Sequence, residues 1–139
     1  MRRAVKTGLP APGQPLEFAT LADGILYTAQ VPIRPDGSVE PGDAGAQVER
    51  TVSNLKMTVE AEGGTVDDVA QVLVYFTGHE HVAAMNEVWK HFFNPPYPQR
   101  ATAIPTGACG LSENSNSIST DHRVVVFSEG SLGKPWQLN

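Results

Sequence analysis

The stretch Asp43–Glu62, DAGAQVERTVSNLKMTVEAE, is followed directly by Gly63 and Gly64. Its apolar residues recur at spacings of four, three and four, the repeat of one helical face, and are Val48, Val52, Leu55 and Val59. The other face is polar. Asp43 is a residue type that caps helix starts, and the glycines allow the left-handed backbone that commonly ends a helix. The stretch therefore predicts a long amphipathic helix over residues 43–62.

Two short β-type runs precede this helix. Leu16–Thr20 and Ile25–Val31 are separated by Ala22-Asp23-Gly24, which is a turn signal of the hairpin kind. A second turn is predicted at Arg34–Ser38, where a proline presets φ and an Asp-Gly pair tolerates the left-handed conformation. We therefore expect a β-hairpin that leads through a turn into the helix.

The sequence after the helix predicts one more helix and three strands. Val69–Phe76 is short and β-branched, which is typical of a strand at the centre of a sheet. A second helical face follows, ended by Asn94-Pro95-Pro96, and its apolar residues are Val82, Met85, Val88, Trp89 and Phe92. Ala101–Pro105 and Arg123–Phe127 complete the strands.

The predicted order is ββαβαββ, an α+β fold in which two helices cover one face of a mixed sheet. The uncovered face of such a small protein should seek a partner, which favours an oligomer. A length of 139 residues fits a single domain, residues 1–139. We expect an irregular N-terminal arm over residues 1–15, a polar loop over 111–120 and a C-terminal tail over 128–139.

Composition argues against several function classes. The net charge of −5 lacks the basic footprint that nucleic-acid binding needs, so no nucleic acid is expected as a partner. No apolar run is long enough to span a membrane, and the N-terminus lacks the apolar stretch of a secretory signal, so a cytoplasmic location is expected. Cys109 is the single cysteine, which excludes an internal disulfide and favours a small packing residue over a nucleophile.

Metal and cofactor motifs are weak. His79-Glu80-His81, with His91 further on, lacks the helical pair of histidines and the supporting partners of a zinc site, so no metal is expected. No phosphate-binding glycine motif is present, and no serine lies in a nucleophile elbow. We expect neither a cofactor nor a Ser-His-Asp hydrolase.

Several segments recur in an order that points to one family. They are LADGILYTAQVP at 21–32, Gln47 with Asn54-Leu55-Lys56, EAEGGTVDDV at 60–69, MNEVWKHFF at 85–93 and YPQRA at 97–101. Together they resemble the YjgF/RidA family of reactive intermediate deaminases, whose strand ends in a similar Ser-Gly-Gln-Ile-Pro. The resemblance implies a chorismate-mutase-like homotrimer with clefts between subunits.

The resemblance also implies a site. Arg100 falls on the family's Pro-x-Arg motif, in which the guanidinium binds a substrate carboxylate, and its planar fork suits that task. The family's water-orienting glutamate on the last strand matches Asp121, although Arg123 could occupy that place instead. Thr102 stands within the family's small pair after the arginine and is expected at a catalytic position.

Further residues are expected around the substrate. Ala29 replaces the family's glycine before the glutamine, and Phe18 and Tyr27 are candidates for an aromatic wall, as is Phe93 at the end of the second helix. Packing roles remain the alternative for these aromatic side chains. Asn86 lies one position away from the apolar stripe and receives no assignment.

The function implied by the resemblance is hydrolysis of reactive imine or enamine carboxylates to a 2-keto acid and ammonia. Arg100 would hold the carboxylate while Asp121 positions water, with no metal or cofactor. A non-catalytic trimer that binds a carboxylate metabolite is the main alternative. A specialised pathway enzyme on a larger imine-like substrate is another, because the loop at 111–120 is long. Ribonuclease activity is disfavoured by the net charge.

Overall fold

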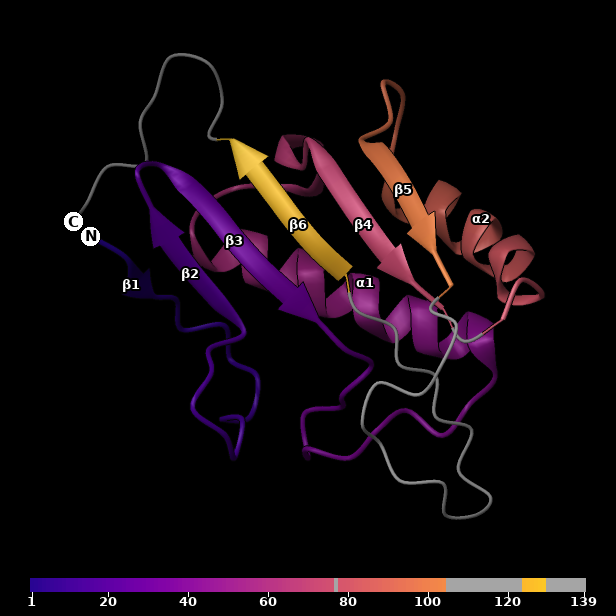
Figure 1. Ribbon diagram of the computed structural model, residues 1–139, viewed down its shortest axis with the longest axis horizontal. Helices are drawn as coiled ribbons and strands as arrows, with labels where there is room; N and C mark the ends of the chain where they lie inside the picture. The colour runs from indigo at the N-terminus through magenta and orange to yellow at the C-terminus, as the bar shows by residue number, and fades with distance from the viewer. Residues whose placement is uncertain (77, 105–123, 130–139) are drawn as a thin grey trace.

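The computed structural model describes residues 1–76, 78–104 and 124–129 (Figure 1). These residues form a six-stranded sheet in the order β1-β2-β3-β6-β4-β5, in which β4 and β5 are parallel and all other neighbours antiparallel. The strands are β1 (Arg3–Ala4), β2 (Ala19–Ala22), β3 (Ile25–Gln30), β4 (Gln71–Tyr75), β5 (Gln99–Ala103) and β6 (Val124–Glu129). The α+β class and the mixed sheet predicted from sequence are confirmed.

Two helices lie side by side against one face of this sheet (Figure 1). They are α1 (Ala44–Ala61) and α2 (His81–Phe92), and a 3-10 turn at Val66–Asp68 precedes β4. The backbone N–H of Ala46 donates to Asp43 Oδ1 at 2.9 Å, and Gly63 has a φ of 78°. The predicted cap and stop of the first helix are therefore confirmed, since the side chain satisfies a free N–H and glycine tolerates positive φ.

The predicted hairpin forms with a shifted start. Asp23 and Gly24 have φ values of 52° and 78°, so the turn consists of these two residues, and Ala22 belongs to β2. The strand begins at Ala19 instead of Leu16. The N–H of Leu16 donates back to the carbonyl of Gln14 at 2.8 Å, and this tight turn removes Leu16 from the ladder.

The N-terminal arm is more ordered than expected at residues 3–5. Arg3 and Ala4 pair with β2 as strand β1, the Arg3 guanidinium forms an ion pair with Glu62 after α1, and Val5 is buried. The edge of β2 offers unpaired backbone groups that a neighbouring segment can satisfy. A strand of this length is too short to leave a periodic signal in the sequence.

The remaining elements lie where the sequence predicts them, within two residues at most ends. β4 is an interior strand, between β6 and β5. α2 ends at Phe92, just before Asn94-Pro95-Pro96. β5 begins at Gln99, two residues before the expected start, because it pairs in register with the beginning of β4.

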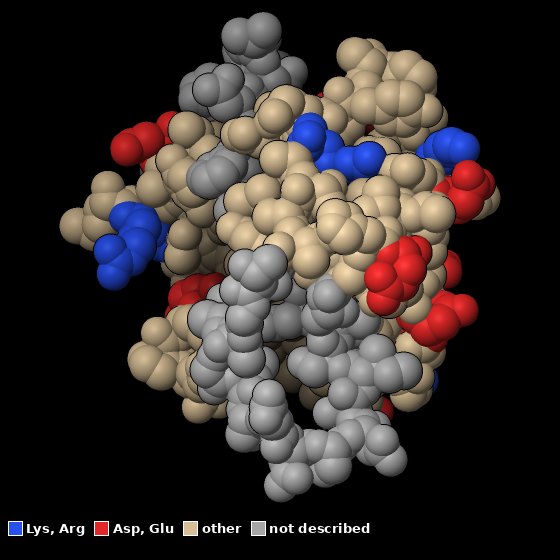
Figure 2. Space-filling view, turned by 45° about the vertical axis from the view of Figure 1, so that its right-hand side comes forward, with Lys and Arg blue, Asp and Glu red and all other residues tan. Residues whose placement is uncertain are grey.

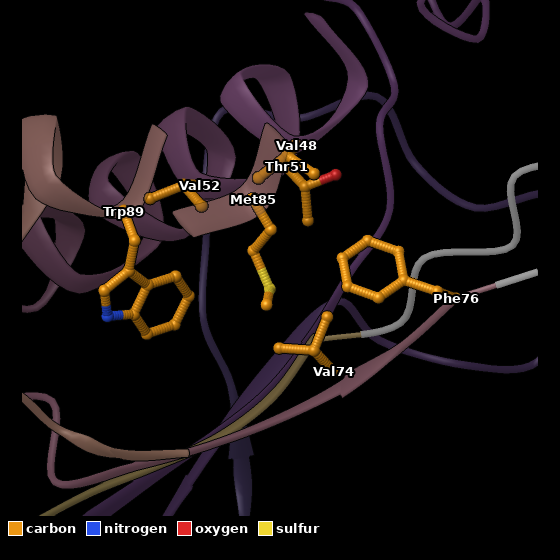
Figure 3. Close-up of a pocket in the computed structure, with 7 residues that line it drawn as sticks. All are labelled: Val48, Thr51, Val52, Val74, Phe76, Met85 and Trp89. Carbon is orange, nitrogen blue, oxygen red and sulfur yellow. The ribbon is translucent and has the colours of Figure 1, made fainter. Parts of the chain in front are cut away.

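Side chains alternate between the two faces of the sheet. Along β3, Leu26, Thr28 and Gln30 are buried against the helices, whereas Tyr27 and Ala29 are exposed on the other face. Between α1, α2 and β4 the core leaves a cavity of about 10 Å³, lined by Val48, Thr51, Val52, Val74, Phe76, Met85 and Trp89 (Figure 3). Its lining is nearly all apolar, so a water molecule would find too few hydrogen-bond partners there.

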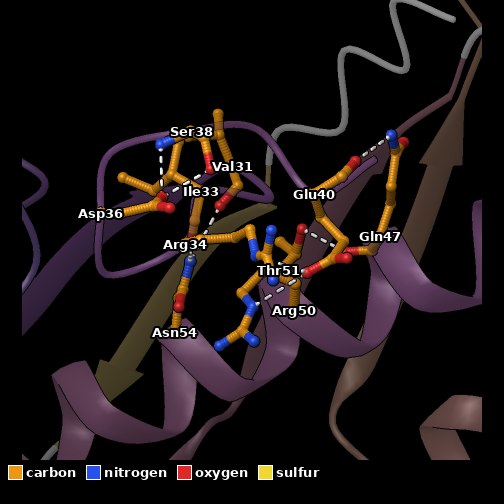
Figure 4. A network of polar contacts seen from close by, with 10 residues as sticks. All are labelled: Val31, Ile33, Arg34, Asp36, Ser38, Glu40, Gln47, Arg50, Thr51 and Asn54. Atoms are coloured by element: carbon orange, nitrogen blue, oxygen red, sulfur yellow. Dashed lines mark hydrogen bonds and ion pairs between the residues drawn. The ribbon is translucent and has the colours of Figure 1, made fainter. Parts of the chain in front are cut away.

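A polar stripe on α1 is also buried, although the sequence analysis assigned the non-apolar positions to a polar face. It consists of Gln47, Thr51, Asn54 and Thr58. The chain after β3 crosses this stripe: Asn54 Nδ2 donates to the carbonyls of Val31 and Ile33 at 3.0 and 2.9 Å (Figure 4). Carbonyl groups leaving a strand need donors, and the stripe supplies them.

Candidate functional site

Arg100 lies on the edge strand β5 and points to the helix side of the sheet. Its register partner on β4 is Val72, which is fully buried under the helices, and paired residues of parallel strands share a face. The strand edge leaves Arg100 half-buried instead of covered. The guanidinium is thus placed between the sheet and α2, at the border with solvent.

Two residues of α2 hold this guanidinium. Arg100 Nη2 donates to Asn86 Oδ1 at 2.7 Å, and its guanidinium carbon lies 5.0 Å from the centroid of the Trp89 ring. Trp89 is buried and in turn contacts Phe93, with ring centroids 4.4 Å apart. The group is therefore oriented by an amide oxygen and an aromatic face.

Neither of these contacts neutralises the charge of Arg100. Among residues 1–76 and 78–104, whose side chains the structure describes, no carboxylate forms an ion pair with it. Burial lowers the pKa of Arg100, but a guanidinium stays protonated in proteins. The bond to Asn86 uses one of several N–H donors, and no other described side chain accepts a hydrogen bond from Arg100, so within the described part of the chain donors remain for a carboxylate ligand.

Thr102 and Phe93 stand in different relations to Arg100. Thr102 follows two residues later on β5, so it shares the face of Arg100, and it is exposed. Phe93 is 2% exposed, and its ring packs against Trp89.

The other predicted substrate-binding residues do not converge on Arg100 within one chain. Tyr27 and Ala29 lie on the opposite face of the sheet, and β6 and β4 separate their strand from β5. Adjacent strands are about 4.8 Å apart, so β3 is roughly 14 Å from β5. Phe18 is half-buried, and its carbonyl accepts from Thr28 Oγ1 and from the N–H of Ala29, beside β3.

Several expectations fall outside the described residues. These are the roles of Asp121, Arg123 and Cys109, the loop at 111–120 and most of the tail at 128–139. Among the residues that the structure does describe, no cluster of three or more metal-ligating side chains occurs. Of the predicted His79-Glu80-His81 group, His81 Nε2 lies 3.7 Å from Glu80 Oε1, which is a contact between neighbours in sequence. None of the described helices is both long and apolar enough to cross a bilayer.

The face shown in Figure 2 is mixed in charge. Figure 2 shows basic and acidic side chains scattered among neutral ones, and no continuous basic stripe crosses the described part of this face. Such a surface lacks the groove of positive charge by which proteins follow a phosphate backbone.

Sequence reasoning missed Asn86 and Trp89 as neighbours of Arg100. Trp89 was read only as core, and Asn86 received no role. Their spacing held a signal: Asn86, Trp89 and Phe93 follow one another at three and four residues, so they lie along one side of α2. That β5 passes beside this side of the helix is a matter of tertiary structure.

Comparison with known proteins agrees with the fold. Residues 9–108 match the Endoribonuclease L-PSP family. A putative endoribonuclease from Thermotoga maritima superposes with a TM-score of 0.78 at 25% identity, covering 94% of this chain and 99% of its own. RidA from an Antarctic Psychrobacter species (TM-score 0.76, 23% identity) covers 91% and 98% of the two chains.

A third solved structure was determined with a small ligand. It is Escherichia coli TdcF with bound serine, with a TM-score of 0.76 and 22% identity over 93% of this chain and 99% of that one. At such identities the likeness shows the fold alone. The family match covers well over half of the sequence, and the chain therefore belongs to the Endoribonuclease L-PSP family, which is the YjgF/RidA family.

Proposed function

We propose that this protein hydrolyses reactive imine and enamine carboxylates, of the 2-iminopropionate type, to 2-keto acids and ammonia. The observation that carries the proposal is Arg100, whose oriented guanidinium has no acidic partner among the described residues. A half-buried cation without a counter-ion destabilises the folded state, because its charge loses contact with water. Such a group is therefore more readily explained as part of a binding site than as a structural element. A substrate carboxylate would complete it with paired charge-assisted hydrogen bonds.

The chemistry asks little of the protein. A protonated imine is already electrophilic; water adds to its carbon, the C–N bond of the resulting carbinolamine breaks, and ammonia leaves as the C=O bond forms. Arg100 would fix the carboxylate so that the imine carbon meets the water in one orientation. Asp121, the counterpart of the family's glutamate, is our candidate for orienting that water.

We further propose that the active form is a cytoplasmic homotrimer with sites between subunits. The helix-free face of the sheet, which carries Tyr27 and Ala29, supports this, since such a face gains by meeting another copy. A neighbouring subunit could bring Tyr27 and Phe18 to a site from which they are remote in one chain. Light scattering after gel filtration would test it: a trimer mass is expected, and a monomer mass would remove the composite site.

The activity can be tested with imine made in place. An amino-acid oxidase generates 2-iminopropionate, and its loss is followed with the wild type, Arg100→Ala and the matched control Arg50→Ala. We expect the wild type and control to accelerate imine loss. For Arg100→Ala we expect at least about a 100-fold lower kcat/KM, since a charged hydrogen-bond pair contributes about 3 kcal/mol. No acceleration by the wild type would remove simple amino-acid imines as substrates.

A carboxylate-binding protein without turnover is the second candidate. One observation favours it: the two residues that hold Arg100, Asn86 and Trp89, do not titrate near neutral pH, so neither can act there as an acid or base. In that case a carboxylate should raise the Tm of the wild type while imine loss stays at the background rate. A larger imine-like substrate is the further alternative, and a panel of bulkier imines would test it.

A further inference from the structure

Arg100 is the outermost of three groups that contact one another in turn at the end of α2. Phe93, which is 2% exposed, contacts Trp89 with ring centroids 4.4 Å apart and an interplanar angle of 31°, and the guanidinium carbon of Arg100 lies 5.0 Å from the centroid of the Trp89 ring. Phe93 directly follows α2 as its C-cap, and its N–H donates to the Trp89 carbonyl at 3.0 Å, so the end of the helix brings the two side chains together. The contact between the two rings is therefore set by α2, and β5 brings Arg100 to the Trp89 ring.

The indole has little freedom to move. It is 5% exposed, and on its inner side it lines the small cavity together with Val52 and Met85 (Figure 3). A side chain enclosed in this way stays in one rotamer. An arginine on an edge strand without such support would sample many rotamers and lose that freedom when a ligand binds.

The two contacts restrain different motions of the guanidinium. The Trp89 face restrains its tilt, because a cation is attracted to the electron-rich face of the ring. The hydrogen bond to Asn86 restrains rotation within the plane, and it occupies only Nη2. Together they leave a fixed edge of N–H donors for a carboxylate lying in the guanidinium plane.

We propose that Trp89, supported by Phe93, is a positioning residue that orders Arg100 before the ligand arrives and so raises the affinity for carboxylates. The inference rests on the proposed function only in taking a carboxylate as the ligand. Trp89 acts through Arg100 and not on the reacting atoms. Its loss should therefore weaken binding, raising KM more than it lowers kcat.

The first experiment needs no ligand or activity. In ¹⁵N-labelled protein the Arg100 Nε–Hε signal, assigned with Arg100→Lys, should lie upfield of the other arginines because of the Trp89 ring current. Trp89→Leu should return it to the ordinary position, and Trp89→Phe should keep part of the shift. An Arg100 signal at the ordinary position in the wild type would overturn the inference, whatever the enzyme assay shows.

The second experiment measures binding of pyruvate by calorimetry. Trp89→Leu should weaken it about fivefold, the effect of a partly desolvated cation–π contact, and Trp89→Phe should restore most of the affinity. In an Arg100→Ala background, Trp89→Leu should change nothing further, because the two residues act as a unit. An equal loss in both backgrounds, or no loss in either, would contradict the proposal.

These outcomes separate the two proposals. If pyruvate binds as expected but no imine is hydrolysed, the proposed activity fails and the role of Trp89 stands. If the wild type hydrolyses imines and Trp89→Leu has wild-type KM, the activity stands and the role of Trp89 fails. Should Trp89→Leu not fold, Trp89→Phe and the wild-type spectrum still decide.

Discussion

Two arginine environments in this protein differ in what holds the charge. Where the chain crosses α1, Arg34 and Arg50 both approach Glu40 Oε2, at 3.7 and 3.5 Å (Figure 4). Where β5 passes α2, Arg100 has an amide oxygen and an indole instead. The first arrangement uses charge to fix a segment of chain. The second orients a charge without neutralising it, which is what a binding site for an anion requires.

The segment near Glu40 is also held by hydrogen bonds from side chains of α1. Gln47 Nε2 donates to the Glu40 carbonyl at 2.9 Å, and Asn54 holds the carbonyls of Val31 and Ile33. These side-chain donors bond to the protein itself, although the buried Gln47 Oε1 has no hydrogen-bond partner among the described residues. The comparison teaches that burial and polarity do not by themselves distinguish a candidate binding site. What distinguishes Arg100 is an oriented charge without an acidic partner among the described residues.

The largest expected effect comes from changing the shape of the cation without its charge. Arg100→Lys should lower kcat/KM for the imine about 30-fold, since an ammonium cannot form the paired bonds and loses about 2 kcal/mol. Arg50→Lys, the matched control, should stay within about twofold because Arg50 pairs with Glu40 and not with a residue of the Arg100 site. Steady-state kinetics would measure kcat/KM for both variants. Equal losses of kcat/KM in the two would contradict the proposed difference between the two arginine environments.

The next largest effect concerns stability, and it compares the segment held by Asn54 with the Arg100 site. Asn54 is 1% exposed, and Asn54→Ala leaves the part-buried carbonyls of Val31 and Ile33 without these donors, so it should lower the free energy of unfolding by about 2 kcal/mol. Asn86 is half-buried and, among the described residues, makes a single side-chain hydrogen bond, to Arg100, so Asn86→Ala should cost less than about 1 kcal/mol. Urea unfolding at one protein concentration measures both. A larger loss for Asn86 would mean that the Arg100 region is structural.

The comparison can also be broken by giving Arg100 an acidic partner. Asn86→Asp creates an internal ion pair that competes with the substrate carboxylate, and KM should rise about fivefold for a pair worth about 1 kcal/mol. The control is Asn94→Asp, which adds the same charge at an exposed position just after α2. An unchanged KM in Asn86→Asp would show that Arg100 does not bind the substrate.

The smallest effect concerns the exposed turn before Glu40. The hydroxyl and then the N–H of Ser38 donate to Asp36 and lower its pKa. A carboxylate whose pKa is lowered by folding stabilises the folded protein at pH values above its pKa in the unfolded state. That contribution is lost as the pH falls through its pKa in the folded state. An NMR titration of the Ser38 amide should therefore show a midpoint below the ordinary aspartate range, absent in Asp36→Asn. A midpoint within that range would contradict a lowering of the Asp36 pKa by the hydrogen bonds from Ser38.

The elements that could be predicted are those whose signal is local. The period of α1, the cap at Asp43 and the Asp23-Gly24 turn each act over a few residues, and the structure confirms them. Strand β1 was missed because its order comes from the edge of β2 and not from its own residues. The burial of the polar stripe was missed because a distant segment covers it.

The candidate site divides in the same way. Arg100 was found from its motif, and the side of α2 that carries Asn86, Trp89 and Phe93 could have been found from spacing. That Arg100 meets this side follows from the parallel pairing of β4 with β5. That Tyr27 and Ala29 lie away from it follows from the insertion of β6 between β3 and β4.

The sequence by itself determined the α+β class, the two amphipathic helices and the presence of an arginine suited to carboxylates, because periodicity, caps and side-chain chemistry are properties of neighbouring residues. Only the tertiary structure decided which groups surround Arg100, that none of its described contacts is acidic, and which face each strand presents. Strand order and helix docking are set by packing between residues far apart in the chain, and no local pattern encodes them.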